Sequence, residues 1–134
     1  MTFKPKVGLI SCSGEDCIGG SVSRAATLRV LHQLKPDETV TICLPLFIAG
    51  DADEREFARV FPTITIDGCS KMCAALQTAK YSAEPSARIC VEDYLPDACS
   101  PAKGKWKIDE FSDIVERVAA DVASAVDSVR DRWR

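Results

Sequence analysis

Apolar and polar positions change period several times along the chain, and each change predicts a new element. Segments rich in β-branched and other apolar residues predict four strands: 6–12, 39–44, 62–68 and 86–95. Segments with helical spacing or helix start signals alternate with them: 21–35, 51–61 and 70–80. Residues 45–51 are predicted to be a loop, Ser21 or Ser23 to cap the first helix, and the third helix to start near Ser70. The alternation predicts an α/β fold, a single three-layer domain with a mostly parallel sheet of about four strands and helices on both faces.

The last predicted element is a long C-terminal helix over residues 107–133 or so. Its apolar residues recur in steps of three and four: Ile108, Phe111, Val115, Val118, Val122, Ala125 and Val129. This spacing fits a coiled-coil seam, through which two copies could form a homodimer. It extends over only about three heptads, however, so we favour a helix that packs on the sheet of its own chain.

Length and charge restrict the class of protein. With 134 residues the chain is expected to form one domain, residues 1–134, with a sizeable core. A net charge of −3 argues against nucleic acid as a partner, because phosphate binding requires a basic surface. The chain has no signal peptide pattern and no run of about 18 apolar residues, so we expect no membrane association and a cytoplasmic location.

Seven cysteines in such a chain need an explanation other than disulfides, which are rare in the cytoplasm. Cys12 and Cys43 end the first two predicted strands, Cys69 follows the third, and Cys73 lies in the first turn of the next helix. The carboxyl ends of parallel strands share one edge of a sheet, which is where ligands bind in α/β folds. We therefore expect these four cysteines to gather at that edge.

The spacing of Cys69 and Cys73 suggests why they occur together. Residues four apart share a helix face, and a helix N-terminus favours a thiolate over a thiol. Four thiolates at one point would repel one another unless a soft cation held them, and sulfur coordination favours zinc or an iron–sulfur cluster. Asp67 is then a turn or cap residue, and Gly68 allows a sharp bend before Cys69.

The same residues carry a family resemblance. The sequence "CSG" after the first strand, "CL" after the second and "IDGC" with a further cysteine after the third resemble the DGC-domain family over residues 7–80. Members of this family are proposed to bind zinc and have no assigned reaction. The resemblance implies that Cys12, Cys43, Cys69 and Cys73 are the metal ligands.

Three cysteines lie outside that ligand set. Cys17 stands in the glycine-rich loop 14–20, which begins at Gly14 and can fold back over the edge, so it could be a further ligand or a redox thiol. Cys90 is predicted to be a core residue within the fourth strand. Cys99 follows in a loop that could approach the edge, and both are weaker ligand candidates.

The leading hypothesis is a cysteine-thiolate metal-binding protein rather than an enzyme, holding zinc in a structural, regulatory or metal-delivery role. One alternative is an iron–sulfur protein for electron transfer or redox sensing, favoured by the surplus cysteines. Another is a thiol oxidoreductase that uses the Cys69/Cys73 pair. A phosphatase of the C-x5-R kind is excluded, because no arginine stands six residues after Cys12, Cys43 or Cys69.

Overall fold

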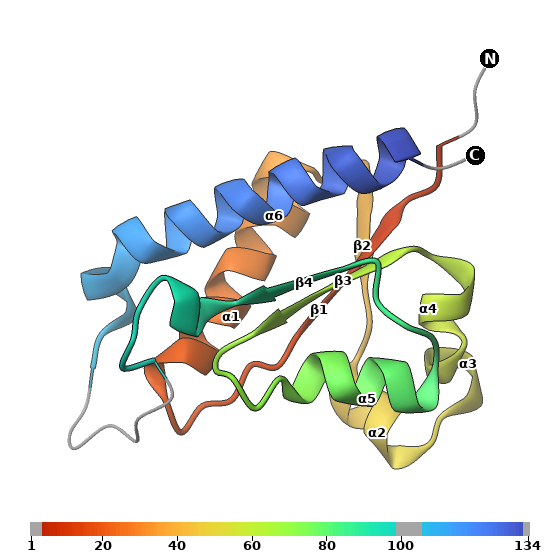
Figure 1. Cartoon of the computed structure of the whole chain (residues 1–134), viewed down its shortest axis with the longest axis horizontal. Helices are drawn as coiled ribbons and strands as arrows, with labels where there is room; N and C mark the ends of the chain where they lie inside the picture. Colours follow the sequence, from red (N-terminus) through yellow and green to blue (C-terminus); the bar gives the residue numbers. More distant parts are fainter. Residues whose placement is uncertain (1–3, 99–105, 133–134) are drawn as a thin grey trace.

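The computed structural model describes residues 4–98 and 106–132. Its four strands form one sheet in the order β2-β1-β3-β4, and every neighbouring pair is parallel. The strands are β1 (Val7–Ser11), β2 (Thr39–Thr41), β3 (Thr63–Asp67) and β4 (Ala87–Cys90). The predicted α/β architecture with a parallel sheet is confirmed (Figure 1).

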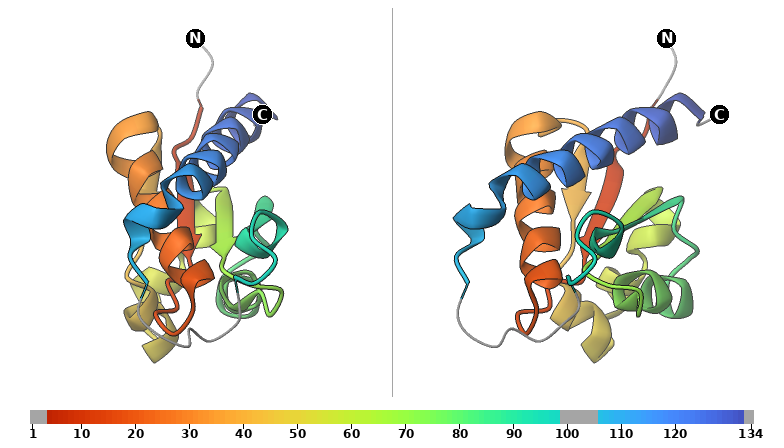
Figure 2. Two further views of the ribbon diagram at one scale, coloured as in Figure 1. Left: turned by 90° about the vertical axis from the view of Figure 1, so that its left-hand side faces the viewer. Right: turned by 60° about the vertical axis from the view of Figure 1, so that its left-hand side comes forward.

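Helices cover both faces of this sheet (Figures 1 and 2). One face carries α1 (Ile18–Arg29), which continues into a π-helical stretch (Val30–Leu34), and the long α6 (Ser112–Arg132). The other face carries α2 (Leu44–Ala49), α3 (Ala52–Arg55), α4 (Phe57–Val60) and α5 (Cys73–Tyr81). Two 3₁₀ turns, Val91–Asp93 and Ile108–Phe111, follow β4 and precede α6.

The main hydrophobic core lies between the sheet and the α1–α6 layer. Alternate strand residues point to opposite faces, so Leu9 joins this core while Ile10 joins a smaller cluster with Phe57 and Ala74 on the other face. The strand β3 contributes Ile64 and Ile66 to the main core, and both are fully buried. Burial of this kind is the dominant favourable term in folding, so most of the apolar stabilisation lies on the α1–α6 side.

The apolar stripe of α6 packs against its own chain, as the favoured interpretation predicted. Val118, Val122, Val126 and Val129 are buried in the main core, while Phe111 packs on it from the preceding 3₁₀ turn. The helix is shorter than predicted, because residues 108–111 form that turn and the α-helix begins only at Ser112. A homodimer through this helix stays a prediction.

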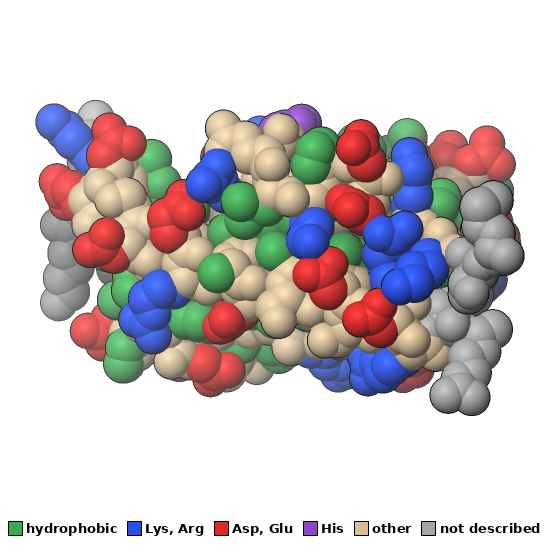
Figure 3. Space-filling view, turned by 90° about the horizontal axis from the view of Figure 1, so that it is seen from above, with side chains coloured by type: hydrophobic (Ala, Val, Ile, Leu, Met, Phe, Trp, Pro, Cys, Tyr) green, Lys and Arg blue, Asp and Glu red, His purple; other side chains and the backbone are tan. Residues whose placement is uncertain are grey.

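The outward side of the α6 layer carries acidic and basic side chains interspersed with small apolar areas (Figure 3). Among the described residues, four ion pairs tie α6 to other segments: Lys4–Asp131, Arg29–Glu116, Lys35–Asp127 and Arg130–Glu38. Each is exposed enough to contribute little stability by itself. None of the helices within the described residues is long and apolar enough to cross a bilayer.

Several boundary predictions were wrong. The strands predicted over 39–44 and 86–95 end at Thr41 and Cys90, so Cys43 lies beyond the end of β2. The helix predicted over 51–61 is divided into α3 and α4. The first helix begins at Ile18 rather than at Ser21 or Ser23, and the Ser23 hydroxyl instead donates a hydrogen bond to the carbonyl of Gly20 inside the helix. The third helix begins at Cys73 rather than near Ser70. Residues 45–51 are mostly helical, because proline is tolerated in a first helical turn and Gly50, at φ 104°, ends α2 in the left-handed conformation.

Candidate metal centre

All the cysteines that the structure describes are free thiols, and they lie where a parallel sheet gathers ligands: Cys12, Cys17, Cys43, Cys69, Cys73 and Cys90. Each one follows a strand, ends a strand or begins a helix that follows a strand. We call this side, where Ser11, Thr41, Asp67 and Cys90 end the four strands, the carboxyl edge (Figure 1). Cys99 lies outside the described residues.

Cys12 is the most firmly held of these thiols. Its backbone N–H donates to the carbonyl of Ile66, 3.0 Å away, which continues the pairing of β1 with β3. Its Sγ accepts a hydrogen bond from the backbone N–H of Gly68 at 3.1 Å and lies 3.6 Å from the Ser23 hydroxyl. Segments from β1, α1 and the β3–α5 loop therefore meet at this sulfur.

Cys73 is exposed at the start of α5, yet its pKa is raised. Partial burial is the largest cause, followed by the negative charges of Asp67, Cys12 and Cys69, while Lys71 acts in the opposite direction. These effects oppose the thiolate that the helix N-terminus is expected to favour. The same charge coupling places Cys12, Cys69 and Cys73 in one electrostatic neighbourhood.

Cys69 reaches this neighbourhood from a turn and not from a helix face. The Cys69 carbonyl accepts a hydrogen bond from the Met72 N–H at 3.1 Å, and α5 begins only after Met72. The argument that Cys69 and Cys73 share a helix face is therefore wrong, although the two residues still lie near one another. Met72 closes the turn at φ 55°, a conformation that costs free energy for a residue with a side chain.

Asp67 caps α5, as the sequence indicated. Its Oδ1 accepts from the Ala74 N–H at 2.7 Å and its Oδ2 accepts from the Ala75 N–H at 3.1 Å. Burial raises the pKa of this carboxyl, and those two hydrogen bonds together with the charge of Arg88 partly oppose the shift. Both oxygens are used inside the fold, which suits a cap better than a metal ligand.

Glycines bring the loops of the carboxyl edge into close contact. A Cβ at Gly68 would lie 2.6 Å from the carbonyl carbon of Gly19 and from the nitrogen of Gly20, and a Cβ at Gly20 would lie 1.7 Å from the carbonyl oxygen of Gly14. Real Cβ atoms do not approach backbone so closely. Gly68 was predicted to allow a sharp bend, but its function here is to let the β3–α5 loop touch the start of α1.

The remaining cysteines lie farther along the same edge. Cys43 is exposed and precedes α2, where its backbone N–H donates to a carboxylate oxygen of Glu54 at 3.1 Å. Cys17 is half-buried at the N-cap position of α1, and its side chain makes no capping hydrogen bond. Cys90 is half-buried at the last position of β4, so its prediction as a core residue was wrong.

The described residues contain no group of three or more Cys, His, Asp or Glu side chains arranged so that it could hold a metal ion. The structure brings Cys12 and Cys69 close enough to Cys73 for their charges to act on it, and places Cys43 beyond the end of β2, at the start of α2. A common centre for the four sulfurs stays a prediction. The donor set itself fits a soft cation, because thiolates are its preferred ligands.

The order of the motifs along this edge agrees with a known family. The DGC domain matches residues 8–125, which is most of the chain. The protein belongs to the DGC domain family. The match continues beyond residues 7–80, where the motifs lie, and includes β4 and most of α6. No curated protein and no solved structure shows significant similarity to this DGC domain.

Proposed function

We propose that this DGC domain binds a zinc ion through the thiolates of Cys12, Cys43, Cys69 and Cys73. The observation that carries the proposal is the convergence of thiols at the carboxyl edge of a parallel sheet, where Cys12 and Cys69 lie close enough to Cys73 for their charges to act on it. Zinc would supply the positive charge that makes ionisation of neighbouring thiols favourable.

Exposure of the thiols supports a regulatory or metal-delivery role over a purely structural one. Cys43 and Cys73 are exposed, so a metal ion or a competing ligand can reach them from solvent. The main core lies between the sheet and the α1–α6 layer and holds fifteen buried residues. Because the fold has this core of its own, a metal ion at the edge is not needed to supply one.

An iron–sulfur cluster is the second candidate, and the number of thiols at the edge favours it. Cys17 and Cys90 lie there in addition to the four proposed ligands, so more sulfur is present than a closed zinc site uses. The thiol oxidoreductase alternative has less support. An attacking cysteine needs a lowered pKa, whereas that of Cys73 is raised.

Anaerobic purification followed by elemental analysis tests this proposal. We expect a colourless protein that contains one zinc per chain, with sulfur as the main ligand in X-ray absorption spectra. A brown protein with iron and acid-labile sulfide would favour the second candidate. Protein that takes up neither metal under anaerobic reconstitution would contradict both, and would leave the thiol chemistry of the edge to be tested by redox titration.

A further inference from the structure

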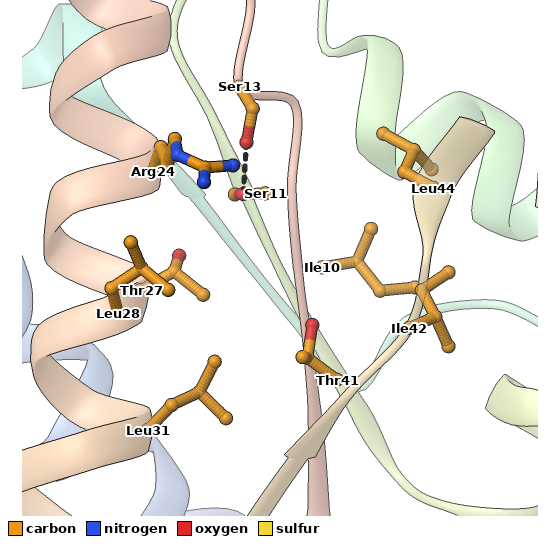
Figure 4. Close-up of a pocket in the computed structure, with 10 residues that line it drawn as sticks. All are labelled: Ile10, Ser11, Ser13, Arg24, Thr27, Leu28, Leu31, Thr41, Ile42 and Leu44. Atoms are coloured by element: carbon orange, nitrogen blue, oxygen red, sulfur yellow. Dashed lines mark hydrogen bonds between the residues drawn. The ribbon is translucent and has the colours of Figure 1, made fainter.

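A second possible site lies beside the cysteines, on the α1 side of the sheet. A cavity of about 160 Å³ opens between α1, the carboxyl ends of β1 and β2, and the start of α2 (Figure 4). No cysteine lines this cavity. Ser11 and Ser13, the residues on either side of Cys12, both line it. The cavity is therefore adjacent to the candidate metal centre and distinct from it.

One end of this cavity offers hydrogen-bond donors. Figure 4 shows the guanidinium of Arg24 extending toward the hydroxyls of Ser11 and Ser13, which hydrogen-bond to each other at 2.6 Å. Only one hydrogen is used between these two hydroxyls, so the pair keeps a second one to donate. Arg24 is exposed and forms no ion pair with any residue that the structure describes.

A buried hydroxyl in the same cavity also lacks a partner. Thr27 is 3% exposed, and its Oγ1 has no hydrogen-bond partner among the described residues. A buried polar group without a partner costs free energy, so a ligand that accepted a hydrogen bond from Thr27 would recover that cost. Thr41, by contrast, already donates its hydroxyl hydrogen to the carbonyl of Leu9.

The rest of the wall is aliphatic. Leu28 contributes from α1 and Leu31 from the π-helical stretch that follows it, and Leu44 closes the opposite side from the start of α2. A cavity of about 150 Å³ accommodates a molecule the size of benzene, so this volume suits a compact ligand of about six heavy atoms. An inorganic oxyanion would leave oxygens against leucine side chains without partners.

We propose that this cavity binds a small monocarboxylate with a short or branched apolar body. The carboxylate accepts from Arg24, from the Ser11–Ser13 pair and from Thr27, and the aliphatic part packs against Leu28 and Leu31. A carboxylate is an acceptor only, which matches a group of donors, and its single charge matches the single arginine. The proposal does not depend on a metal ion at the cysteines.

The test is titration of the full chain, with and without added zinc, by acetate, butyrate and isovalerate, followed by nuclear magnetic resonance of the backbone amides. We expect saturable shifts at Ser13, Arg24 and Thr27, strongest with isovalerate. Isoamyl alcohol has nearly the same shape without the charge and is expected to bind about tenfold more weakly or worse, because a charge-assisted hydrogen bond is lost.

Two substitutions locate the ligand. Arg24→Ala should weaken isovalerate binding about tenfold, whereas Arg29→Ala, on the same helix and outside the cavity, should leave it unchanged. Thr27→Val removes only the unpartnered hydroxyl, so the protein should fold with equal or greater stability while binding weakens about threefold or more.

Several results would overturn the proposal. These are the absence of saturable shifts with any of the three carboxylates at millimolar concentration, equal binding of isoamyl alcohol, or binding that Arg24→Ala and Thr27→Val leave intact. Inorganic phosphate that binds at these residues where isovalerate does not would also exclude the carboxylate class. Because zinc is varied separately, failure here is distinguishable from failure of the proposed metal centre.

Discussion

At the scale of single residues, Asp67 connects the sheet to the candidate metal centre. It ends β3, its carboxylate accepts hydrogen bonds from two buried residues of α5, and its charge acts on Cys73. One side chain thus fixes the start of the helix that carries Cys73. This capping role explains why an aspartate stands beside the cysteines in the motif.

Asp67→Ala is expected to lower the free energy of unfolding by about 2–4 kcal/mol, because the N–H groups of Ala74 and Ala75 lose their acceptors inside the fold. Asp51→Ala is the matched control. It removes a single, partly buried cap hydrogen bond that Asp51 accepts from the Glu54 N–H, and should cost only about 1 kcal/mol. Urea unfolding of both variants measures the difference, and equal losses would contradict the role given to Asp67.

The thiols themselves are expected to change their order of reactivity when metal binds. Without metal, Cys43 is exposed and should be alkylated ahead of Cys73, whose raised pKa leaves less thiolate. With zinc bound, the four ligands are protected, and Cys17 should become the most readily alkylated cysteine. Brief iodoacetamide treatment and peptide mapping of both forms test this. Protection of Cys17 until the metal is removed would make it a ligand and exclude a site of only the four proposed cysteines.

At the scale of elements, the carboxyl edge depends on contact between the β3–α5 loop and the first turn of α1. The N–H of Gly68 donates to Cys12, and the N–H of Gly19 donates to the carbonyl of Ala98 at 2.9 Å. A further hydrogen bond, 2.7 Å long, runs from the Ser70 N–H to a carboxylate oxygen of Glu92. The loops after β1, β3 and β4 therefore support one another around Cys12.

Gly68→Ala should disrupt this contact, because its Cβ would lie 2.6 Å from the backbone of Gly19 and Gly20. We expect a loss of stability of about 2 kcal/mol or more and weaker zinc binding, since the N–H of residue 68 also contacts Cys12. Gly14→Ala is the control, because its Cβ would approach nothing closer than the Asp16 carboxylate at 3.4 Å. Equal behaviour of the two variants in thermal unfolding and zinc titration would refute the contact's importance.

The hydrophobic periodicity of the sequence correctly predicted the order of strands and helices. Apolar runs and helical spacing are local signals, and the local structure of most segments agrees with them. The prediction failed where local signals conflict with tertiary contacts. The sequence predicts a loop over residues 45–51, yet most of them form α2, which holds Pro45 in its first turn and ends at Gly50. Ser23 resembles a cap in the sequence but lies within α1 near Cys12. The sequence predicts a strand that continues to residue 95, which would make Cys90 a core residue, whereas β4 ends at Cys90. Once that end is known, the rule that ligands gather at the carboxyl ends of parallel strands includes Cys90 as well.

At the scale of the whole molecule, the core that stabilises the fold and the candidate metal centre lie in different parts of the protein. The main core lies between the sheet and α1 with α6, whereas the thiols lie at one edge. A protein arranged in this way can fold without metal and gain stability when metal binds, since ligand binding to the folded state shifts the folding equilibrium. Zinc binding should therefore appear as an increment in stability rather than as a condition for folding.

The free energy of unfolding is expected to rise by a measurable amount when zinc binds. With free zinc at about one hundred times its dissociation constant, the wild-type protein should gain about 2.7 kcal/mol, and a chelator should remove this gain without unfolding the chain.

Cys69→Ser should lose most bound zinc and most of the gain, because it removes a proposed ligand. Cys90→Ala should keep both and show only a packing penalty. Thermal unfolding with and without chelator, read beside zinc content, compares the two variants. Equal responses to the two substitutions would mean that the division between ligands and neighbouring thiols is wrong.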